Sequence, residues 1–307
     1  MISSLLLMRI AQLFLALILG WVLVKAKILK SEDSRVLSAL ALYAAYPCMI
    51  FSVFQTEISE ELIQGLLLAA GSGCSALLIF FILSSVLNRP LRLNRIEQAN
   101  VIYSNGGNLI IPLVNTLLGK EWLIYTIPYS VIQMVLFWSH CRILLSGEKK
   151  ISLKKIFCNV NMLSIAIGAV LFSLNLMVPP QALEAIDSIG DLLGPLSMMT
   201  AGMLIGGRKL RQIFAYHGIW KVCTLRLLFF PMVMLCILKY SGIASLVHKG
   251  ETILLISFLA ISAPCAATPT QMAVIFGQDA EYSGAIYAVT TLLCIITMPL
   301  MVNLFQL

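Results

Sequence analysis

The sequence predicts an all-α integral membrane protein in which ten transmembrane helices form two halves of five. Of the 307 residues, 60% are hydrophobic and only 11% are charged, and the mean hydropathy is +0.95. Soluble domains carry about 25% charged residues, so water cannot cover such a chain. The apolar residues are gathered in long runs, and most basic residues between them fall in alternate connections. These observations together define the fold class.

Ten apolar runs are each long enough to cross a bilayer, for which a helix needs about 20 residues. We do not interpret the first run as a cleaved signal peptide, because Lys25, Lys27 and Lys30 follow it where small residues would be needed. The runs are 5–24, 34–54, 62–87, 97–118, 122–145, 160–178, 183–205, 217–239, 251–275 and 282–305.

The connections between the runs divide the basic residues unequally. Most of the 21 Lys and Arg residues lie in or beside the connections that follow runs 1, 3, 5 and 7. The positive-inside rule places these connections in the cytoplasm and both termini outside. The net charge of +7 therefore indicates membrane topology rather than nucleic-acid binding.

Several kinds of site are missing from the sequence. The eight cysteines are scattered, with no CxxC pair and no Cys/His cluster at metal-binding spacing. No Walker A loop, dinucleotide fingerprint, HExxH or GxSxG motif occurs. We therefore expect no cofactor, no metal and no enzymatic activity.

Two of the runs are interrupted near their middle. The fourth carries the cluster at 105–112, which reads Asn-Gly-Gly-Asn-Leu-Ile-Ile-Pro, and the ninth carries Ala-Pro-Cys-Ala-Ala-Thr-Pro at 263–269. Gly and Pro loosen a helix, and the freed backbone groups need partners inside protein or beside a polar cavity. A matched pair of interrupted helices indicates the substrate site of a transporter.

The long basic connection at about 146–159 divides the chain into halves, 1–150 and 151–307. The halves resemble each other in the placement of prolines, because Pro47 and Pro195 each fall within the second run of their half. Five is an odd number, so a repeated half must enter the membrane in the opposite orientation. The sequence therefore predicts an inverted repeat, with binding near the bilayer midplane.

Short patterns across the chain resemble the auxin efflux carrier family, which includes plant auxin exporters and bacterial dicarboxylate carriers. The fourth run matches the family's Asn-x-Gly-x-x-Gly-x-Pro pattern at Asn105, Gly107 and Pro112, with Ile110 in place of the second glycine. The other similar patterns are Gly194-Pro195, Ala201-Gly202-Met203, Arg226-Leu227-Leu228 with Pro231, Ser262-Ala263-Pro264, Gly277-Gln278-Asp279 and Thr297-Met298-Pro299-Leu300.

The resemblance implies a scaffold of helices 1, 2, 6 and 7 and a mobile core of helices 3–5 and 8–10. Helices 4 and 9 would cross at their breaks, and transport would proceed by elevator-like alternating access. It also implies a bacterial cytoplasmic membrane and leaves a homodimer open. Plant members have an asparagine in the ninth-helix break, where this chain offers Thr268, Thr270 and Gln271. That departure questions auxin as the substrate.

The free ends of the interrupted helices suit a small organic anion. A helix N-terminus carries about half a positive charge and unpaired N–H groups, so it can hold a carboxylate without a buried Lys or Arg. We expect side-chain donors at Asn105 and Asn108; alternatively, Asn105 satisfies carbonyls freed by Pro112. The predicted substrate site comprises Asn105, Gly106, Gly107, Asn108, Pro112, Pro264, Thr268, Pro269 and Gln271.

Three charged residues within or near the runs have two interpretations each. Arg226 either attracts anions at the inner vestibule or reaches lipid phosphates, which avoids the cost of a central arginine. Asp187 and Asp191 are spaced i, i+4 and lie on one helix face. They are either a proton-coupling site or solvated acids at a helix end.

The sequence thus predicts a secondary carrier that moves small organic anions, in particular carboxylates, between the bilayer's two sides. One alternative is a sodium- or proton-coupled symporter of the related bile-acid-transporter-like fold. Another is a membrane sensor that binds a ligand without moving it, although such a protein needs an output domain.

Overall fold

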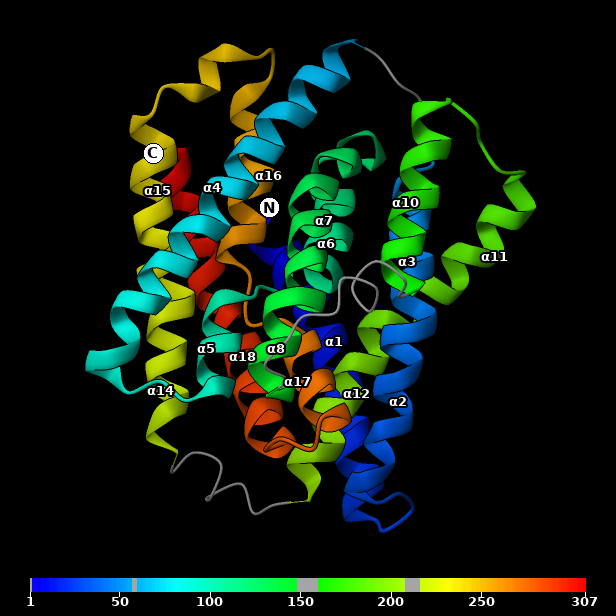
Figure 1. Ribbon diagram of the computed structural model, residues 1–307, viewed down its shortest axis with the longest axis vertical. Helices are drawn as coiled ribbons and strands as arrows, with labels where there is room; N and C mark the ends of the chain where they lie inside the picture. The colour runs from blue at the N-terminus through cyan, green and yellow to red at the C-terminus, as the bar shows by residue number, and fades with distance from the viewer. Residues whose placement is uncertain (1, 57–59, 148–159, 208–215) are drawn as a thin grey trace.

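The computed structural model describes residues 2–56, 60–147, 160–207 and 216–307, and its regular elements there are helical (Figure 1). Each predicted apolar run overlaps helical structure, and the runs 97–118 and 251–275 each contain a break between helices. The first half contains α1 (Ile2–Lys25), α2 (Ser34–Leu40), α3 (Tyr46–Val53), α4 (Glu60–Leu91), α5 (Arg95–Ile102), α6 (Ile111–Leu117), α7 (Ile127–Leu136) and α8 (Arg142–Ser146). The second half contains α10 (Val160–Ser173), α11 (Pro180–Gly190), α12 (Leu193–Gly206), α14 (His217–Thr224), α15 (Phe230–Tyr240), α16 (Gly250–Ser262), α17 (Ala267–Ile275) and α18 (Ala280–Gln306).

Six helical stretches in the described part of the chain are long and apolar enough to cross a membrane. Shorter apolar helices accompany them at Phe14–Lys25, Val160–Ser173 and Gly250–Ser262. The six long stretches are Ser31–Val53, Glu60–Leu91, Glu121–Ser146, Pro180–Gly206, His217–Tyr240 and Ala280–Gln306. The chain is therefore an all-helical, multi-pass integral membrane protein.

Three helical stretches have a π-helical turn just before a proline. The turns are Ala41–Ala45, Gly106–Ile110 and Leu225–Phe229, and in each case a proline lies two residues beyond the end of the turn. Proline has no N–H and its ring clashes with the carbonyl four residues earlier. A wider turn at that place lets the helix continue without that clash.

α1 and α12 pack with their backbones almost in contact. A side chain at Gly202 would overlap the Leu17 carbonyl oxygen, and one at Gly20 would overlap the carbonyl oxygen of Met199. Small residues allow such close approach between membrane helices. α2 contacts α12, and α3 contacts α10 and α11. Helices of the predicted scaffold from the first and the second half of the chain therefore pack together.

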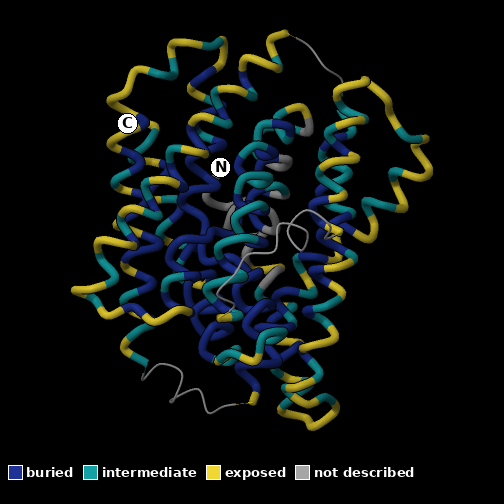
Figure 2. The backbone as a smooth tube through the Cα atoms, in the orientation of Figure 1, coloured by how far each residue is buried: buried dark blue, intermediate teal, exposed yellow. Residues whose placement is uncertain are grey.

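The remaining helices surround the two interrupted ones. α16 contacts α4, α15 and α18, while α18 also contacts α14 and α17. Figure 2 shows this centre as the most buried part of the molecule. Residues 256–273, which include the second interruption, are buried without a gap.

Candidate functional site

Two helical stretches stop inside the buried centre and restart after a short irregular segment. α5 ends at Ile102, and the π-helical turn that leads into α6 begins at Gly106. α16 ends at Ser262, and α17 begins at Ala267. We call the segments between these helices, 103–105 and 263–266, the crossing.

The two segments of the crossing pair with each other through their backbones. They form an isolated antiparallel bridge. The N–H of Asn105 donates to the carbonyl of Pro264 at 2.8 Å, and the N–H of Ala266 donates to the carbonyl of Tyr103 at 3.0 Å. Backbone groups in the interior of a membrane protein must be satisfied within the protein, and here each interruption supplies partners for the other.

The first segment is also held by side chains of α7. The Oε1 of Gln133 accepts a hydrogen bond from the N–H of Ser104 at 3.0 Å, and its Nε2 donates to the Ser104 carbonyl at 2.8 Å. The hydroxyl of Ser104 lies 2.7 Å from that of Tyr129. Ser104 therefore has both backbone groups and its side chain fixed by one neighbouring helix.

The second segment has a weaker side-chain support. The hydroxyl of Thr290, on α18, accepts a hydrogen bond from the N–H of Cys265 at 3.3 Å. The same hydroxyl donates to the carbonyl of Ile286 in its own helix at 2.8 Å. This segment relies more on its backbone pairing with the first.

Arg226 lies under the crossing, fully buried. Its guanidinium donates to carbonyls at the ends of α5 and α16, and it lies over the ring of Phe80 with 5.1 Å between Cζ and the ring centroid. The partners are Ile261 at 2.7 Å, Ala263 at 3.0 Å, and Val101 and Ile102 at 3.4 Å.

A small cavity adjoins the crossing on another side. All ten residues that line it are buried. None of these lining residues is charged. They are Tyr46, Ser104, Asn105, Gln133, Phe137, Leu193, Ala266, Ala267, Thr268 and Gln271.

Asn105 brings an unpaired donor to this cavity. Its side chain is 3% exposed, and its Nδ2 meets no hydrogen-bond partner in the described part of the chain. The hydroxyl of Tyr287 lies beside it and is likewise without a partner of suitable geometry there. A buried amide that lacks a partner costs about 1–3 kcal/mol, so the cavity favours a ligand that accepts a hydrogen bond.

The predicted substrate residues lie around the crossing. Thr268 and Gln271 line the cavity, and the Nε2 of Gln271 donates to the Ser197 hydroxyl of α12 at 3.0 Å. Pro264 belongs to the crossing, while Pro269 lies in the first turn of α17. Gly106 begins the π-helical turn and packs against Tyr129. The side chains of Asn108 and Pro112 and the surroundings of Gly107 lie outside the part that the structure describes.

Arg226 is not where the sequence suggested. The expectation that it reaches lipid phosphates is wrong, because its side chain is 0% exposed and hydrogen-bonded to four carbonyls. The π-helical turn Leu225–Phe229 places it at the crossing rather than near a helix end. Anion attraction at an inner vestibule stays a prediction.

Asp187 and Asp191 lie in different surroundings. Asp187 is half-buried and accepts a hydrogen bond from the hydroxyl of Ser52 on α3. Asp191 is the exposed C-cap residue of α11. The structure does not bring the two carboxylates into one buried pair, and a proton-coupling role for either stays a prediction.

Sequence reasoning missed three polar residues of the site: Gln133, Thr290 and Tyr129. Gln133 and Thr290 are polar side chains inside apolar runs, a pattern that indicates function in a membrane segment. That signal could have found both. Tyr129 follows Pro128 and gives no comparable signal, because aromatic residues are common in apolar runs.

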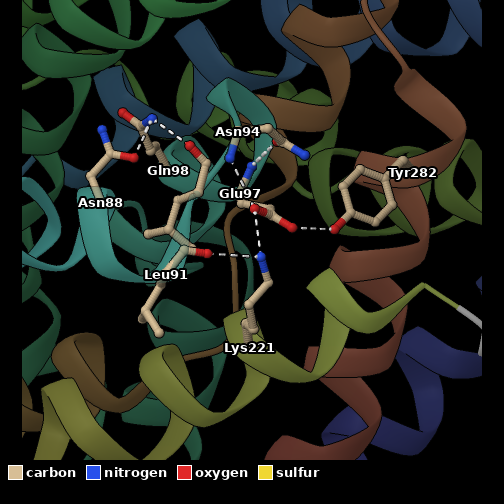
Figure 3. Close-up of polar contacts among 8 residues, drawn as sticks. Asn88, Leu91, Asn94, Glu97, Gln98, Lys221 and Tyr282 are labelled. Atoms are coloured by element: carbon tan, nitrogen blue, oxygen red, sulfur yellow. Dashed lines mark hydrogen bonds and ion pairs between the residues drawn. The ribbon is translucent and has the colours of Figure 1, made fainter.

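A second polar cluster fixes the start of α5 (Figure 3). Glu97 forms a capping box with Asn94 at the helix start. Its carboxylate also accepts from the hydroxyl of Tyr282 at 2.7 Å and lies 3.3 Å from the Nζ of Lys221. A side chain at Gly218 would overlap both Glu97 and the Tyr282 hydroxyl. This cluster ties α5, α14 and α18 together at one end of the interrupted helix.

Comparison with known families connects this geometry to a function class. A family model described as a membrane transport protein matches residues 5–157 and again residues 148–302. A search of curated proteins finds no match. The family match covers nearly the whole chain in two copies, which agrees with two interrupted helices, one in each copy. The chain therefore belongs to the auxin efflux carrier family of membrane transporters.

Proposed function

We propose that this transporter is a secondary carrier of small organic anions, in particular carboxylates. The observation that carries the proposal is the buried cavity at the crossing, where the unpaired Nδ2 of Asn105 meets the first turn of α17. No side chain of the described residues caps α17, and Ala267 and Thr268 of that turn line the cavity. An uncapped helix N-terminus and an amide donor together favour a carboxylate.

The cavity is small in this conformation. It has about 10 Å³ of space for the centre of a water molecule, which is room for about one water. A carboxylate would therefore need the core to move against the scaffold, as the proposed alternating access allows.

The position of the cavity supports elevator-like alternating access. Tyr46 of α3 and Leu193 of α12 line it from the proposed scaffold, and the other lining residues belong to the proposed core. A core that slides against the scaffold would carry the crossing and its ligand with it.

We further propose ten membrane passes in two inverted halves, with both termini outside a bacterial cytoplasmic membrane. In Figure 1 the connection from α1 to α2 and the start of α14 lie at the lower end of the molecule. The start of α4 and the connection from α15 to α16 lie at the upper end. The positive-inside rule assigns the lower end to the cytoplasm.

Flux through proteoliposomes tests the function. Vesicles that contain the purified full chain are loaded with labelled mono- or dicarboxylates, and release is compared with that from empty vesicles. Primary amines of matched size serve as the control substrates. We expect release of at least one carboxylate and of no amine. Carboxylate release equal to that of empty vesicles over the whole panel would favour a sensor that binds without transport.

Coupling can be tested in the same vesicles. A dependence of flux on an inward or outward pH gradient, lost in Asp187→Asn, would support proton coupling through that residue. A dependence on sodium would support the bile-acid-transporter-like alternative. A monoanion that crosses without a coupling ion changes its free energy by about 2.3 kcal/mol per 100 mV of membrane potential. Its flux should therefore depend on the membrane potential but on neither the pH gradient nor sodium.

A further inference from the structure

The charge of Arg226 is buried at the crossing, and no carboxylate in the described part of the chain pairs with it. Its side chain is 0% exposed, four of its hydrogen bonds go to main-chain carbonyls, and the hydroxyl of Tyr129 is a further, neutral side-chain partner. A guanidinium is not deprotonated in proteins, so a full positive charge is held there. Some negative partner must offset the cost of burying it.

The partners are the ends of two helix dipoles. Val101 and Ile102 are the last residues of α5, while Ile261 and Ala263 flank the end of α16. The last carbonyls of a helix lack intrahelical partners and carry about half a negative charge in total. Two such ends face the guanidinium, one from each half of the chain. Their combined partial charge is about equal and opposite to that of Arg226.

A ring of carbonyls at the ends of two half-helices is also a site for a metal cation. In transporters built on interrupted helices, unwound carbonyls and helix C-terminal ends coordinate the coupling ion. We propose that the Arg226 guanidinium is a fixed cation in the place of a coupling sodium ion. This inference rests on the proposed carrier function and deepens it: the carrier moves its anion without sodium.

Two other roles for Arg226 fit the contacts less well. It is absent from the residues that line the cavity, so it does not hold the substrate directly. It does not reach solvent or lipid, so it does not anchor the helix at the membrane surface. A fixed cation, by contrast, explains why the donors Nε, Nη1 and Nη2 each meet a carbonyl.

Removal of the side chain should convert the site into one that responds to cations. We compare the purified full-length protein with Arg226→Ala and Arg226→Lys, and with Arg89→Ala as a control at an exposed arginine. Thermal unfolding is followed in sodium, in N-methylglucamine and with millimolar guanidinium added. This readout needs no substrate, so it stands even if the carrier proposal fails.

We expect the melting temperature of the wild type to be the same in sodium and in N-methylglucamine. Arg226→Ala should melt about 10 °C lower, as breaking a buried charge network does, and guanidinium or sodium should restore part of the loss. Arg226→Lys keeps the charge with fewer directed donors, so it should be intermediate and insensitive to sodium. Arg89→Ala should behave as the wild type.

Several results would overturn the inference. One is a sodium-dependent melting temperature or sodium-dependent flux in the wild type. Another is an Arg226→Ala protein that melts like the wild type, or one that stays destabilised with either cation present. If Arg226→Ala does not fold, the wild-type sodium measurements and Arg226→Lys decide. Absence of carboxylate flux together with guanidinium rescue would reject the carrier proposal while leaving the cation site intact.

Discussion

The two interrupted helices meet at one place but are held there differently. The first segment of the crossing has Ser104 fixed at both backbone groups by Gln133 and at its side chain by Tyr129. The second has a hydrogen bond of 3.3 Å from the N–H of Cys265 to the hydroxyl of Thr290, and its first carbonyl, at Ala263, accepts one of 3.0 Å from Arg226. Asn105 of the first segment offers a side-chain donor, whereas α17 offers backbone N–H groups. The first break therefore suits recognition of a ligand by a side chain, and the second suits recognition by the N-terminus of α17.

The largest effect is expected from Asn105→Ala. A hydrogen bond to a charged ligand contributes about 1.5–3 kcal/mol, so kcat/KM for the carboxylate should fall about 10- to 150-fold. The melting temperature without ligand should stay near that of the wild type, because the Nδ2 of the lost amide has no hydrogen-bond partner within the described chain. Initial uptake rates in vesicles measure the effect.

The control for this change is Asn303→Ala, at an exposed asparagine near the end of α18. It should transport normally. Wild-type transport in Asn105→Ala would contradict the assignment of the first break to side-chain recognition.

Gln133→Leu should have the next largest effect, and on stability as well as transport. The change leaves the buried N–H and carbonyl of Ser104 without their partner, at about 1–3 kcal/mol for each unsatisfied group. We expect a lower melting temperature and about tenfold slower transport. Gln98→Leu removes a glutamine that bonds to Asn88 and Leu93 outside the crossing, and it should spare transport. Equal losses in both variants would mean that Gln133 acts only through general stability.

Thr290→Val should lower transport less, because it removes one long hydrogen bond to the crossing, besides bonds within α18, while keeping the shape of the side chain. A typical hydrogen bond contributes about 0.5–1.5 kcal/mol, so transport should fall about fivefold or less. Thr297→Val, in which the lost bond goes to the same helix, is the matched control. A loss as large as that in Gln133→Leu would show that the two segments are held equally.

The smallest effect is expected from Thr268→Ala. Thr268 lines the cavity from the first turn of α17, where we assign recognition to backbone N–H groups that the change leaves in place. Affinity for the carboxylate should change by about twofold or less, by analogy with conservative surface changes of about 0.5 kcal/mol. Ligand-induced stabilisation of the purified protein measures it. A loss comparable to that in Asn105→Ala would mean that both breaks use side chains.

Much of the helical fold could be predicted from the sequence because its signals are local. Hydropathy located the apolar stretches, and Gly and Pro clusters marked both interruptions. The partners of the interruptions could not be predicted in the same way. Gln133 and Thr290 reach Ser104 and Cys265 only because α7 and α18 pack beside the crossing. Helix packing of this kind is not local and leaves only the weak signal of a polar residue in an apolar run.

The surroundings of Arg226 were the hardest to predict from the sequence. The sequence predicts a place for this residue at the inner vestibule or within reach of lipid phosphates, near one membrane surface. Its actual surroundings depend on where α5 and α16 end, and those ends face each other only in the folded molecule. The π-helical turns before Pro47, Pro112 and Pro231, by contrast, follow a spacing that is visible in the sequence.

The placement of Arg226 also sets an order for biogenesis. The segment His217–Tyr240 is synthesised after Val101 and Ile102 but before Ile261 and Ala263. When this segment enters the bilayer, the stretch that carries half of the carbonyls around its arginine has not yet followed it. Burying Arg226 in the bilayer at this stage costs about 2.5–3.5 kcal/mol, which the apolar residues of the same segment must offset. The crossing is therefore completed late, when the ninth apolar stretch joins a bundle that already contains Arg226.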